Sequence, residues 1–291
     1  MTTSDLWAKW LLERQFGGNE EHMRLVLESL YPVRDAVLEH AALAGDETLL
    51  DVGCGDGLIG FGALEKLPYG KVIFSDVSQD LLDHTRQLVK AMGVMDRCQF
   101  VHADAASLAP FDADSVDVVT TRSVLIYVDD KRRAFSAFYR VLKPGGMLSI
   151  FEPINRFGHP MPAGDFWGFD VTPISDLAER VKAIYAAIQP LEDDPMLNFD
   201  ERDLFQLALD AGFSDVSLEY KADQRPYPPP LIDWEVYLDT APNPRVPTLR
   251  EAMTQALNAD ERQRFIDYLR PVFERGAGTS RQAVAYLWAE K

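Results

Sequence analysis

Apolar and polar residues alternate along the chain in a pattern that predicts short strands separated by amphipathic helices. Between residues 48 and 152, five apolar runs of strand length each end at a polar or glycine-containing turn, and helical spacing of apolar residues fills most of the intervals. This alternation predicts parallel strands with helices on both faces of one sheet. The predicted strands cover 48–52, 71–75, 99–102, 116–120 and 147–152, and the predicted helices cover 57–67, 79–92 and 130–142.

The regular alternation of predicted strands and helices does not continue directly on either side of this region. Residues 4–44 have helical spacing, and a proline-, glycine- and aromatic-rich loop follows Glu152 before a predicted helix at 173–188. A helix at 201–212 and strands at 216–222 and 283–288 enclose a second insertion. We therefore predict a helical N-terminal arm at 1–44, a core at 45–152, cap insertions at 153–200 and 225–280, and the rest of the core sheet at 201–224 and 281–291.

Composition narrows the class of protein. The 291 residues are 47% apolar and 26% charged, which is typical of a globular chain large enough to bury a full core. The net charge of −17 argues against a nucleic-acid partner, because phosphates require a basic surface. Cys54 and Cys98 are too few for a disulfide framework and suit a reducing cytoplasm. We find no signal-peptide pattern and no apolar run long enough to span a membrane, and we expect a monomer or homodimer.

The candidate chemistry begins at Leu49–Gly60, with the sequence LLDVGCGDGLIG. Gly53, Gly55 and Gly57 follow an apolar strand, and glycine lets a backbone turn sharply and approach a ligand closely. The helix that starts near Leu58 adds unpaired N–H donors at its first turn. The stretch therefore predicts a nucleotide-sized cradle at the carboxyl end of a strand.

This stretch has two interpretations. Gly55–Gly60 fits the G-x-G-x-x-G dinucleotide fingerprint, and Asp76 lies about 20 residues further on, as that fingerprint requires. A nicotinamide or flavin enzyme is one hypothesis. Asp51, placed just before the first glycine, favours the other interpretation, because a carboxylate there suits a cationic ligand and repels a pyrophosphate.

The pattern Asp51–Gly57 resembles motif I of the class I S-adenosylmethionine-dependent methyltransferases. Asp117–Leu125 resembles the strand-four segment of that family, and Leu142–Leu148, LKPGGML, resembles its LKPGG turn. The resemblance covers about residues 48–152 and is closest to the type 11, ubiquinone/menaquinone-methyltransferase-like group that modifies small molecules. It implies an α/β, Rossmann-like, doubly wound sheet of seven strands in the order 3-2-1-4-5-7-6, with the last strand antiparallel.

The resemblance implies transfer of a methyl group from S-adenosylmethionine to an N, O or C atom of a small aromatic or apolar metabolite, with S-adenosylhomocysteine as product. The alternatives are a non-methylating homologue that binds the same cofactor, such as a cyclase or a partner subunit, and a nicotinamide-dependent oxidoreductase. Asp76 would accept the ribose hydroxyls, and Asp104 with Ala105 would contact the adenine. The implied cofactor-binding residues are Asp51, Gly53, Cys54, Gly55, Gly57, Asp76, Val77, Asp104, Ala105 and Arg122.

The candidate catalytic residues are Arg122, His159 and Tyr127. Arg122 is expected near the reaction centre, where it would hold a substrate carboxylate or pair with Asp104 or Glu152. His159 and Tyr127 are candidate bases for a hydroxyl or carbon acceptor, against the simpler alternatives of an exposed loop histidine and a packed tyrosine. Because Arg122 stands where a metal-dependent methyltransferase would need a carboxylate, we expect no metal ion.

Both insertions are expected to leave the sheet at its ligand-binding edge. Their aromatic residues would line an apolar substrate site, or else form the cap's own core. In the arm, Trp7 and Trp10 either pack on the domain body or cover the substrate mouth. The aromatic residues of the insertions are Phe157, Phe166, Trp167, Phe169, Tyr227, Trp234 and Tyr237.

Overall fold

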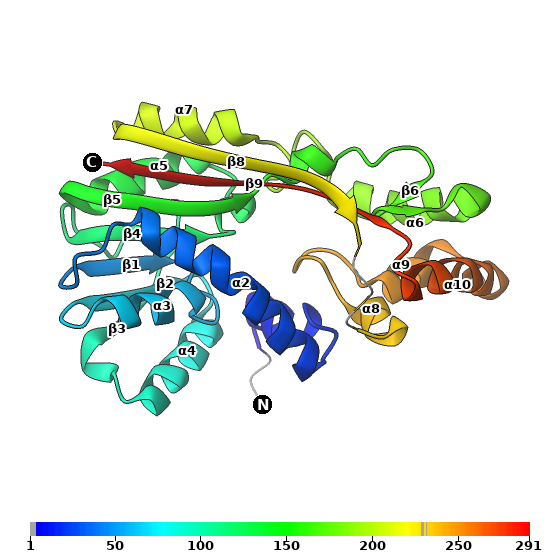
Figure 1. Ribbon diagram of the computed structural model, residues 1–291, viewed down its shortest axis with the longest axis horizontal. Coiled ribbons are helices and arrows are strands. Elements are labelled where there is room, and N and C mark those ends of the chain that lie inside the picture. Colours follow the sequence, from blue (N-terminus) through cyan, green and yellow to red (C-terminus); the bar gives the residue numbers. More distant parts are fainter. Residues whose placement is uncertain (1–3, 228–229, 231) are drawn as a thin grey trace.

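A mixed seven-stranded sheet forms the centre of the computed structural model, which describes residues 4–227, 230 and 232–291. The strand order is β3-β2-β1-β4-β5-β9-β8, and β9 runs antiparallel between β5 and β8 (Figure 1). This confirms the predicted Rossmann-like order with an antiparallel last strand. The strands are β1 (Thr48–Val52), β2 (Lys71–Asp76), β3 (Cys98–His102), β4 (Val116–Arg122), β5 (Leu142–Pro153), β8 (Ser214–Pro226) and β9 (Thr279–Glu290).

The central strands are buried on both faces, which is why their sequences are apolar runs without a polar side. Successive residues of a strand point to opposite faces. Leu49 therefore packs with α2, α3 and α4, whereas Leu50 packs with α5 and α7 on the other face. Both leucines have no exposed surface. The helices are α2 (Glu20–His40), α3 (Leu58–Lys66), α4 (Gln79–Met92), α5 (Lys131–Val141) and α7 (Glu201–Ala211).

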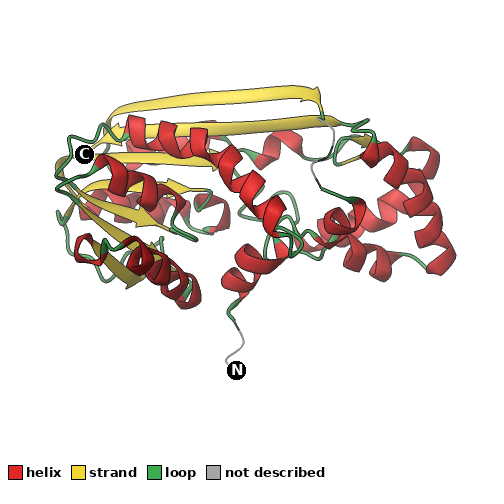
Figure 2. Ribbon diagram, turned by 60° about the horizontal axis from the view of Figure 1, so that its bottom comes forward, coloured by secondary structure: helices red, strands yellow, loops and turns green. Residues whose placement is uncertain are grey.

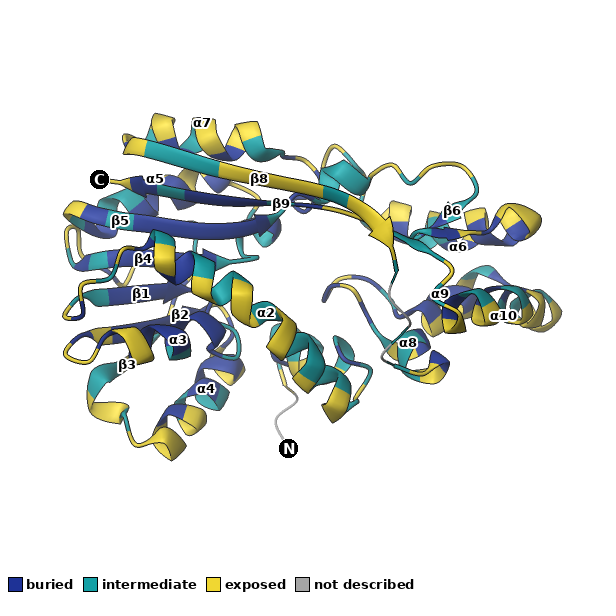
Figure 3. Ribbon diagram, viewed as in Figure 1, coloured by how far each residue is buried: buried dark blue, intermediate teal, exposed yellow. Residues whose placement is uncertain are grey.

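Strands β8 and β9 are longer than the sequence pattern predicts. Their pairing continues to Pro226 opposite Thr279, beyond the other strands of the sheet. The two strands form a ribbon that leaves the core and reaches the cap (Figures 1 and 2). Much of β8 is exposed, since it is the edge strand (Figure 3). The predicted strand at 216–222 is thus four residues short at its carboxyl end.

Residues from both insertions share a third hydrophobic cluster, separate from the two that cover the sheet. Phe166, Trp234 and Phe265 are almost completely buried in it. The predicted insertion 225–280 includes residues 228, 229 and 231, which lie outside the described part of the chain. The elements of this region are the hairpin β6 (Asp165–Phe166) and β7 (Phe169–Asp170), and the helices α6 (Ser175–Ile188), α8 (Trp234–Asp239), α9 (Leu249–Ala256) and α10 (Ala259–Glu274).

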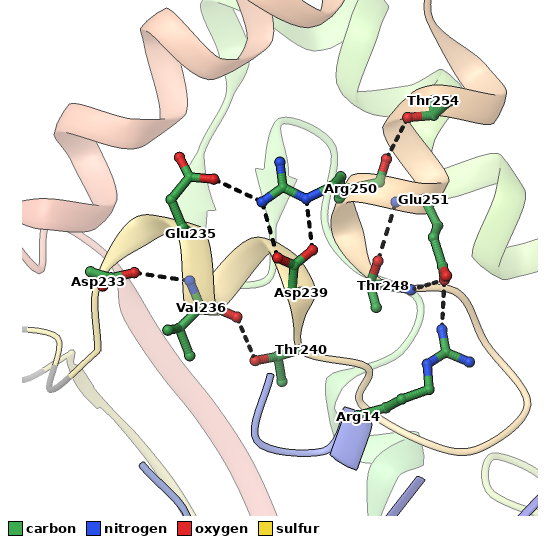
Figure 4. Close-up of polar contacts among 10 residues, drawn as sticks. All are labelled: Arg14, Asp233, Glu235, Val236, Asp239, Thr240, Thr248, Arg250, Glu251 and Thr254. Carbon is green, nitrogen blue, oxygen red and sulfur yellow. Dashed lines mark hydrogen bonds and ion pairs between the residues drawn. The ribbon is translucent and has the colours of Figure 1, made fainter. Parts of the chain in front are cut away.

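The N-terminal arm contacts both the core and the cap. It starts with α1 (Leu6–Lys9), continues as a π-helical turn, η1 (Trp10–Arg14), and joins α2 after a glycine-containing turn. Asp5 caps α1 and accepts a hydrogen bond from the hydroxyl of Ser78 in the core at 2.6 Å. At the other end, Arg14 forms an ion pair with Glu251 of α9 at 2.6 Å (Figure 4). The arm therefore bridges the two parts of the molecule.

Candidate functional site

The turn between β1 and α3 requires glycine for conformational and steric reasons. Gly53, Gly55 and Gly57 all have positive φ, at 65°, 55° and 91°. A Cβ atom on Gly53 would lie 2.4 Å from Cγ2 of Val124, which is closer than real Cβ atoms come to another atom. Gly57 is the N-cap residue of α3. The backbone of this turn is thus held close to the segment that follows β4.

Two buried carboxylates fix the turn by accepting hydrogen bonds. Asp51 accepts hydrogen bonds from the backbone N–H of Gly60 at 3.0 Å and from the hydroxyl of Thr120 at 3.2 Å. Asp76 accepts from the backbone N–H of Gly55 at 2.9 Å and of Ser78 at 2.8 Å. Burial raises the pKa of Asp51 to about 7, and it also raises the pKa of Asp76.

A cavity of about 640 Å³ opens at the carboxyl ends of the parallel strands. This is the edge at which open α/β sheets bind their ligands. The ends of β1, β2, β3, β4 and β5 each contribute residues, and the arm supplies a further wall. The predicted site residues that line this cavity are Asp51, Gly53, Cys54, Gly55, Asp76, Val77, Asp104, Ala105, Arg122 and Tyr127.

Two of the predicted residues are placed elsewhere. Gly57 does not line the cavity, because its position is at the start of α3, where it shapes the turn. His159 lines a second cavity of about 830 Å³, next to Trp167 and Tyr227, and its Nδ1 lies 3.1 Å from the carbonyl oxygen of Asn155. The chain leaves β5 through a short 3₁₀ turn and carries His159 away from the ends of β1–β4. His159 therefore does not line the cavity that Arg122 and Tyr127 line, and the simpler alternative of a loop histidine fits its position better.

The arm closes one side of the cavity with aromatic rings. The ring centroid of Trp7 lies 4.9 Å from that of Tyr127, edge to face, and that of Trp10 lies 6.3 Å from it. The indole N–H of Trp10 donates to the carbonyl of Ala241 at 2.9 Å, which ties this wall to the cap. Of the two alternatives for these tryptophans, the structure supports the one in which the arm covers the cavity.

Several lining residues were not singled out in the sequence. Leu11 and Gln15 follow the two tryptophans at helical spacing, so the apolar face of the arm was the signal that could have found them. Met196 and Pro242 have no local signal, because they reach the cavity only through the packing of the insertions.

Glu152 organises the segment between β4 and α5. It is completely buried and accepts hydrogen bonds from the backbone N–H groups of Val124, Leu125 and Ile126, at 3.0, 2.9 and 3.2 Å. Burial raises its pKa to about 7. These bonds fix the 3₁₀ turn η3 (Leu125–Tyr127) and with it the position of Tyr127, whose own pKa burial raises. The sequence predicts Glu152 only as a partner for Arg122, and nothing local in it indicates these backbone bonds.

Arg122 is the last residue of β4, and its half-buried side chain lines the cavity. Across the described ranges, its guanidinium has no ion pair and no hydrogen bond. The predicted partner Glu152 accepts from backbone instead, and Asp104 accepts from the backbone N–H of Ala106 at 3.0 Å. Neither predicted pairing forms. Cys54 is buried and its thiol pKa is raised, which suits a structural thiol and not a nucleophile.

The aromatic residues of the insertions divide between core and surface of the cap. Phe166, Phe169 and Trp234 are buried in the cap cluster, and Tyr237 packs against it. Trp167 and Tyr227 line the second cavity. Of the two alternatives for these aromatic residues, the structure supports the cap's own core for Phe166, Phe169 and Trp234, and none of the six lines the main cavity.

These features fit an adenosyl ligand with an amino-acid tail. Gly53 and Gly55 line the cavity, so their backbone is accessible to a ligand, and Asp76 lines it with each carboxylate oxygen fixed by one backbone N–H. Among the described residues, the positive charge of Arg122 has no partner and also lines the cavity. In the part of the chain that the structure describes, no three His, Cys, Asp or Glu residues could hold a metal ion, and the expectation of a metal-free site stays a prediction. None of the described helices is long and apolar enough to cross a membrane.

Comparison with known proteins agrees with this geometry. The family described as "Methyltransferase domain" matches residues 49–146. The ubiquinone/menaquinone biosynthesis C-methyltransferase UbiE of Escherichia coli O1:K1 / APEC is 32% identical over 174 residues, which cover 58% of this chain and 67% of that protein. UbiE of Cronobacter sakazakii is 30% identical over 155 residues, covering 51% of this chain but only 58% of that protein.

A solved structure shares the fold over nearly the whole chain. Phosphoethanolamine N-methyltransferase 2 of Haemonchus contortus, in complex with S-adenosyl-L-methionine, superposes with a TM-score of 0.52. The two are 18% identical, and the match covers 98% of this chain and 56% of that one. At this level of identity the similarity concerns the fold.

Proposed function

Since the chain belongs to the class I S-adenosylmethionine-dependent methyltransferases, we propose that it transfers a methyl group from S-adenosylmethionine to a small molecule bound in the main cavity. The observation that carries the proposal is the cavity at the carboxyl edge of β1–β5, which the glycine turn, Asp76 and Asp104 line together. These carboxylates offer the hydrogen-bond acceptors that the hydroxyl and amino groups of an adenosyl ligand need.

The residues toward the cofactor have distinct roles. Asp76 accepts hydrogen bonds from the ribose hydroxyls, because each of its oxygens keeps acceptor capacity beyond the one backbone N–H that it already receives. Asp104 and Ala105 flank the adenine. Gly53 and Gly55 let the ligand approach the backbone, and Asp51 places negative charge beneath a cationic ligand. When bound, S-adenosylmethionine supplies a methyl group already activated on a sulfonium.

The protein's part is then to orient the acceptor and to exclude water. Tyr127 faces the cavity from the turn that Glu152 fixes, so its hydroxyl is held ready to hydrogen-bond an acceptor. Trp7 and Trp10 shield the same side from solvent. The arm and the cap insertions would close over the acceptor, which makes the division into arm, core and cap a functional one.

The net charge of the protein favours a small molecule as the methyl acceptor. The net charge of −17 disfavours a nucleic acid as acceptor, and the volume of the cavity, about 640 Å³, limits the size of a bound ligand. Cys54 and Cys98 are both free, which suits a reducing cytoplasm. We propose a cytoplasmic enzyme, active as a monomer or homodimer.

Binding of S-adenosylhomocysteine, measured by calorimetry, tests the proposal. Asp76→Ala should weaken binding by about 2–4 kcal/mol, because charged hydrogen bonds contribute about 1.5–3 kcal/mol each and are not fully additive. Asp210→Ala is the matched control, since Asp210 is a surface carboxylate that pairs with Arg132. Unchanged affinity in the Asp76 variant would remove the role assigned to it.

Turnover distinguishes the remaining alternatives. Formation of S-adenosylhomocysteine from S-adenosylmethionine in the presence of a panel of small amines, phenols and activated carbon acids would establish methyl transfer. Cofactor binding without turnover on any acceptor would favour a non-methylating homologue. Binding of a nicotinamide dinucleotide in place of S-adenosylhomocysteine would contradict the proposal.

A further inference from the structure

The cavity presents its ligand-binding groups in the order of the strands. Asp104 follows β3, Asp76 ends β2, Gly53 follows β1 and Arg122 ends β4, and these four strands are neighbours in the sheet. Strands lie about 4.8 Å apart, so the row from Asp104 to Arg122 spans about 14 Å. An extended ligand lying across this row has one end at Asp104 and the other at Arg122.

The adenosine end of the cofactor belongs at the acidic side of this row. Asp76 can accept hydrogen bonds from the ribose, whereas no carboxylate is suited to contact another carboxylate. The amino-acid end of the cofactor, with its ammonium and carboxylate, must then extend past Gly53 toward β4. This step rests on the proposed function, because it takes the ligand to be S-adenosylmethionine.

A carboxylate at that end requires a positive partner, and the cavity has few. Its lining includes the acids Asp51, Asp76 and Asp104, and two arginines, Arg122 and Arg133. Arg133 is exposed and lies on α5, which Asp129 and Asp130 precede. Arg122 is half-buried and lies at the end of β4, which is hydrogen-bonded along its length to β1.

The surroundings of Arg122 place its charge close to the glycine turn. It lowers the pKa of Asp51 and of Asp56, against the effect of burial, and Asp56 lies within that turn. Both oxygens of Asp51 already accept hydrogen bonds, from Gly60 and Thr120. A guanidinium held near these acids, yet bonded to none of them in the described structure, retains its five donors for a ligand.

We propose that Arg122 is a positioning residue that binds the α-carboxylate of S-adenosylmethionine. A planar guanidinium can hold a carboxylate through two parallel hydrogen bonds, which fixes orientation as well as position. The methionine portion is thereby anchored at its far end, and the sulfonium is held between Asp76 and Arg122. Arg122 thus serves the cofactor, not the acceptor.

Calorimetry with two ligands tests this assignment. The first ligand is S-adenosylhomocysteine, and the second is decarboxylated S-adenosylhomocysteine, which lacks only the α-carboxylate. In Arg122→Met, affinity for the first should fall about 10- to 100-fold, the loss expected for charge-assisted hydrogen bonds. Affinity for the second should change less than about threefold, and that binding also shows that the variant is folded. Arg122→Lys should recover part of the loss, because it keeps the charge without the planar geometry.

Arg132→Met is the control for the loss of one positive charge from an acidic protein, since Arg132 lies on the surface and pairs with Asp210. It should bind both ligands as the unchanged protein does. An equal loss for both ligands in Arg122→Met, or no loss for either, would overturn the assignment. Unchanged affinities together with a raised KM for an acceptor would assign Arg122 to the acceptor. If the unchanged protein binds neither ligand, the proposed function itself fails.

Discussion

At position 53 both the backbone conformation and the surrounding space require glycine. The φ of Gly53 is 65°, and a Cβ atom there would press against Val124. The positive φ costs a residue with a side chain about 1–2 kcal/mol. The contact with Val124 forces the turn away from the segment that follows β4.

Gly53→Ala should therefore lower the free energy of unfolding by more than about 2 kcal/mol and weaken S-adenosylhomocysteine binding at least about tenfold. Denaturant unfolding and calorimetry measure the two effects. Adding Val124→Ala should restore part of both losses, because it removes the atom in collision. Gly18→Ala is the matched control: its φ is 69°, but no atom lies within 4 Å of its would-be Cβ, so only the conformational strain remains. Equal effects at the two glycines would contradict the steric argument.

At the scale of single elements, the first helix of the arm depends on its cap. Asp5 accepts hydrogen bonds from the backbone N–H of Trp7 and Ala8, at 3.0 and 2.9 Å, and also from the hydroxyl of Ser78. One side chain thus starts α1 and fastens it to the core. The cavity wall made by Trp7 and Trp10 depends on this attachment.

Asp5→Ala should destabilise α1 by about 1 kcal/mol, which corresponds to about a fivefold increase in the equilibrium constant for opening of the arm. Hydrogen exchange over residues 5–14 should speed up, and the dissociation rate of S-adenosylhomocysteine should rise by a similar factor in stopped flow. Asn258→Ala removes an equivalent cap from α10, far from the cavity, and should leave the dissociation rate unchanged. A similar rate in all three proteins would mean that the arm does not gate the ligand.

Elements could be predicted from the sequence where local pattern decides them. Four of the five parallel strands, β1, β2, β4 and β5, are largely buried, so their apolar runs are clear in the sequence, and the strand order follows from the resemblance. The end of β8 could not be predicted. Asp223–Pro226 has the composition of a loop, and it becomes a strand only because 279–282 pairs with it outside the sheet.

At the scale of the whole molecule, the cap has its own hydrophobic cluster. Trp234 is almost fully buried there, beside the stacked rings of Tyr237 and Phe273. The same packing explains why the sequence could not place the cap aromatics or His159. Their positions depend on contacts between segments about 60 to 100 residues apart, which no local pattern records. Residues at strand ends, such as Asp76 and Arg122, line the predicted edge because the sheet itself brings them together.

Trp234→Ala should destabilise the cap by about 3–5 kcal/mol, the usual loss for a large aromatic removed from a core. Hydrogen exchange should rise across α6, α8, α9 and α10, whereas strands β1–β5 should keep their protection. Affinity for S-adenosylhomocysteine should change little, because none of the buried residues of the cap cluster lines the main cavity. Loss of protection in β1 and β4 as well would show that core and cap unfold as one unit.

The raised pKa of Asp51 links cofactor binding to the uptake and release of protons. With a pKa of about 7 in the free protein, this carboxyl is about half protonated at neutral pH. A cation bound above it favours the ionised form and lowers that pKa, so binding expels a proton. Affinity therefore rises as pH increases through 7 and levels off above it.

Calorimetry of S-adenosylmethionine in phosphate and in Tris should give different apparent enthalpies, since the buffer takes up the proton. S-adenosylhomocysteine, which lacks the sulfonium charge, should release less, and Asp51→Asn should abolish the difference between buffers. Identical enthalpies in the two buffers would mean that binding does not change the protonation of Asp51. The acid beneath the glycine turn would make this protein sense pH through its affinity for the methyl donor.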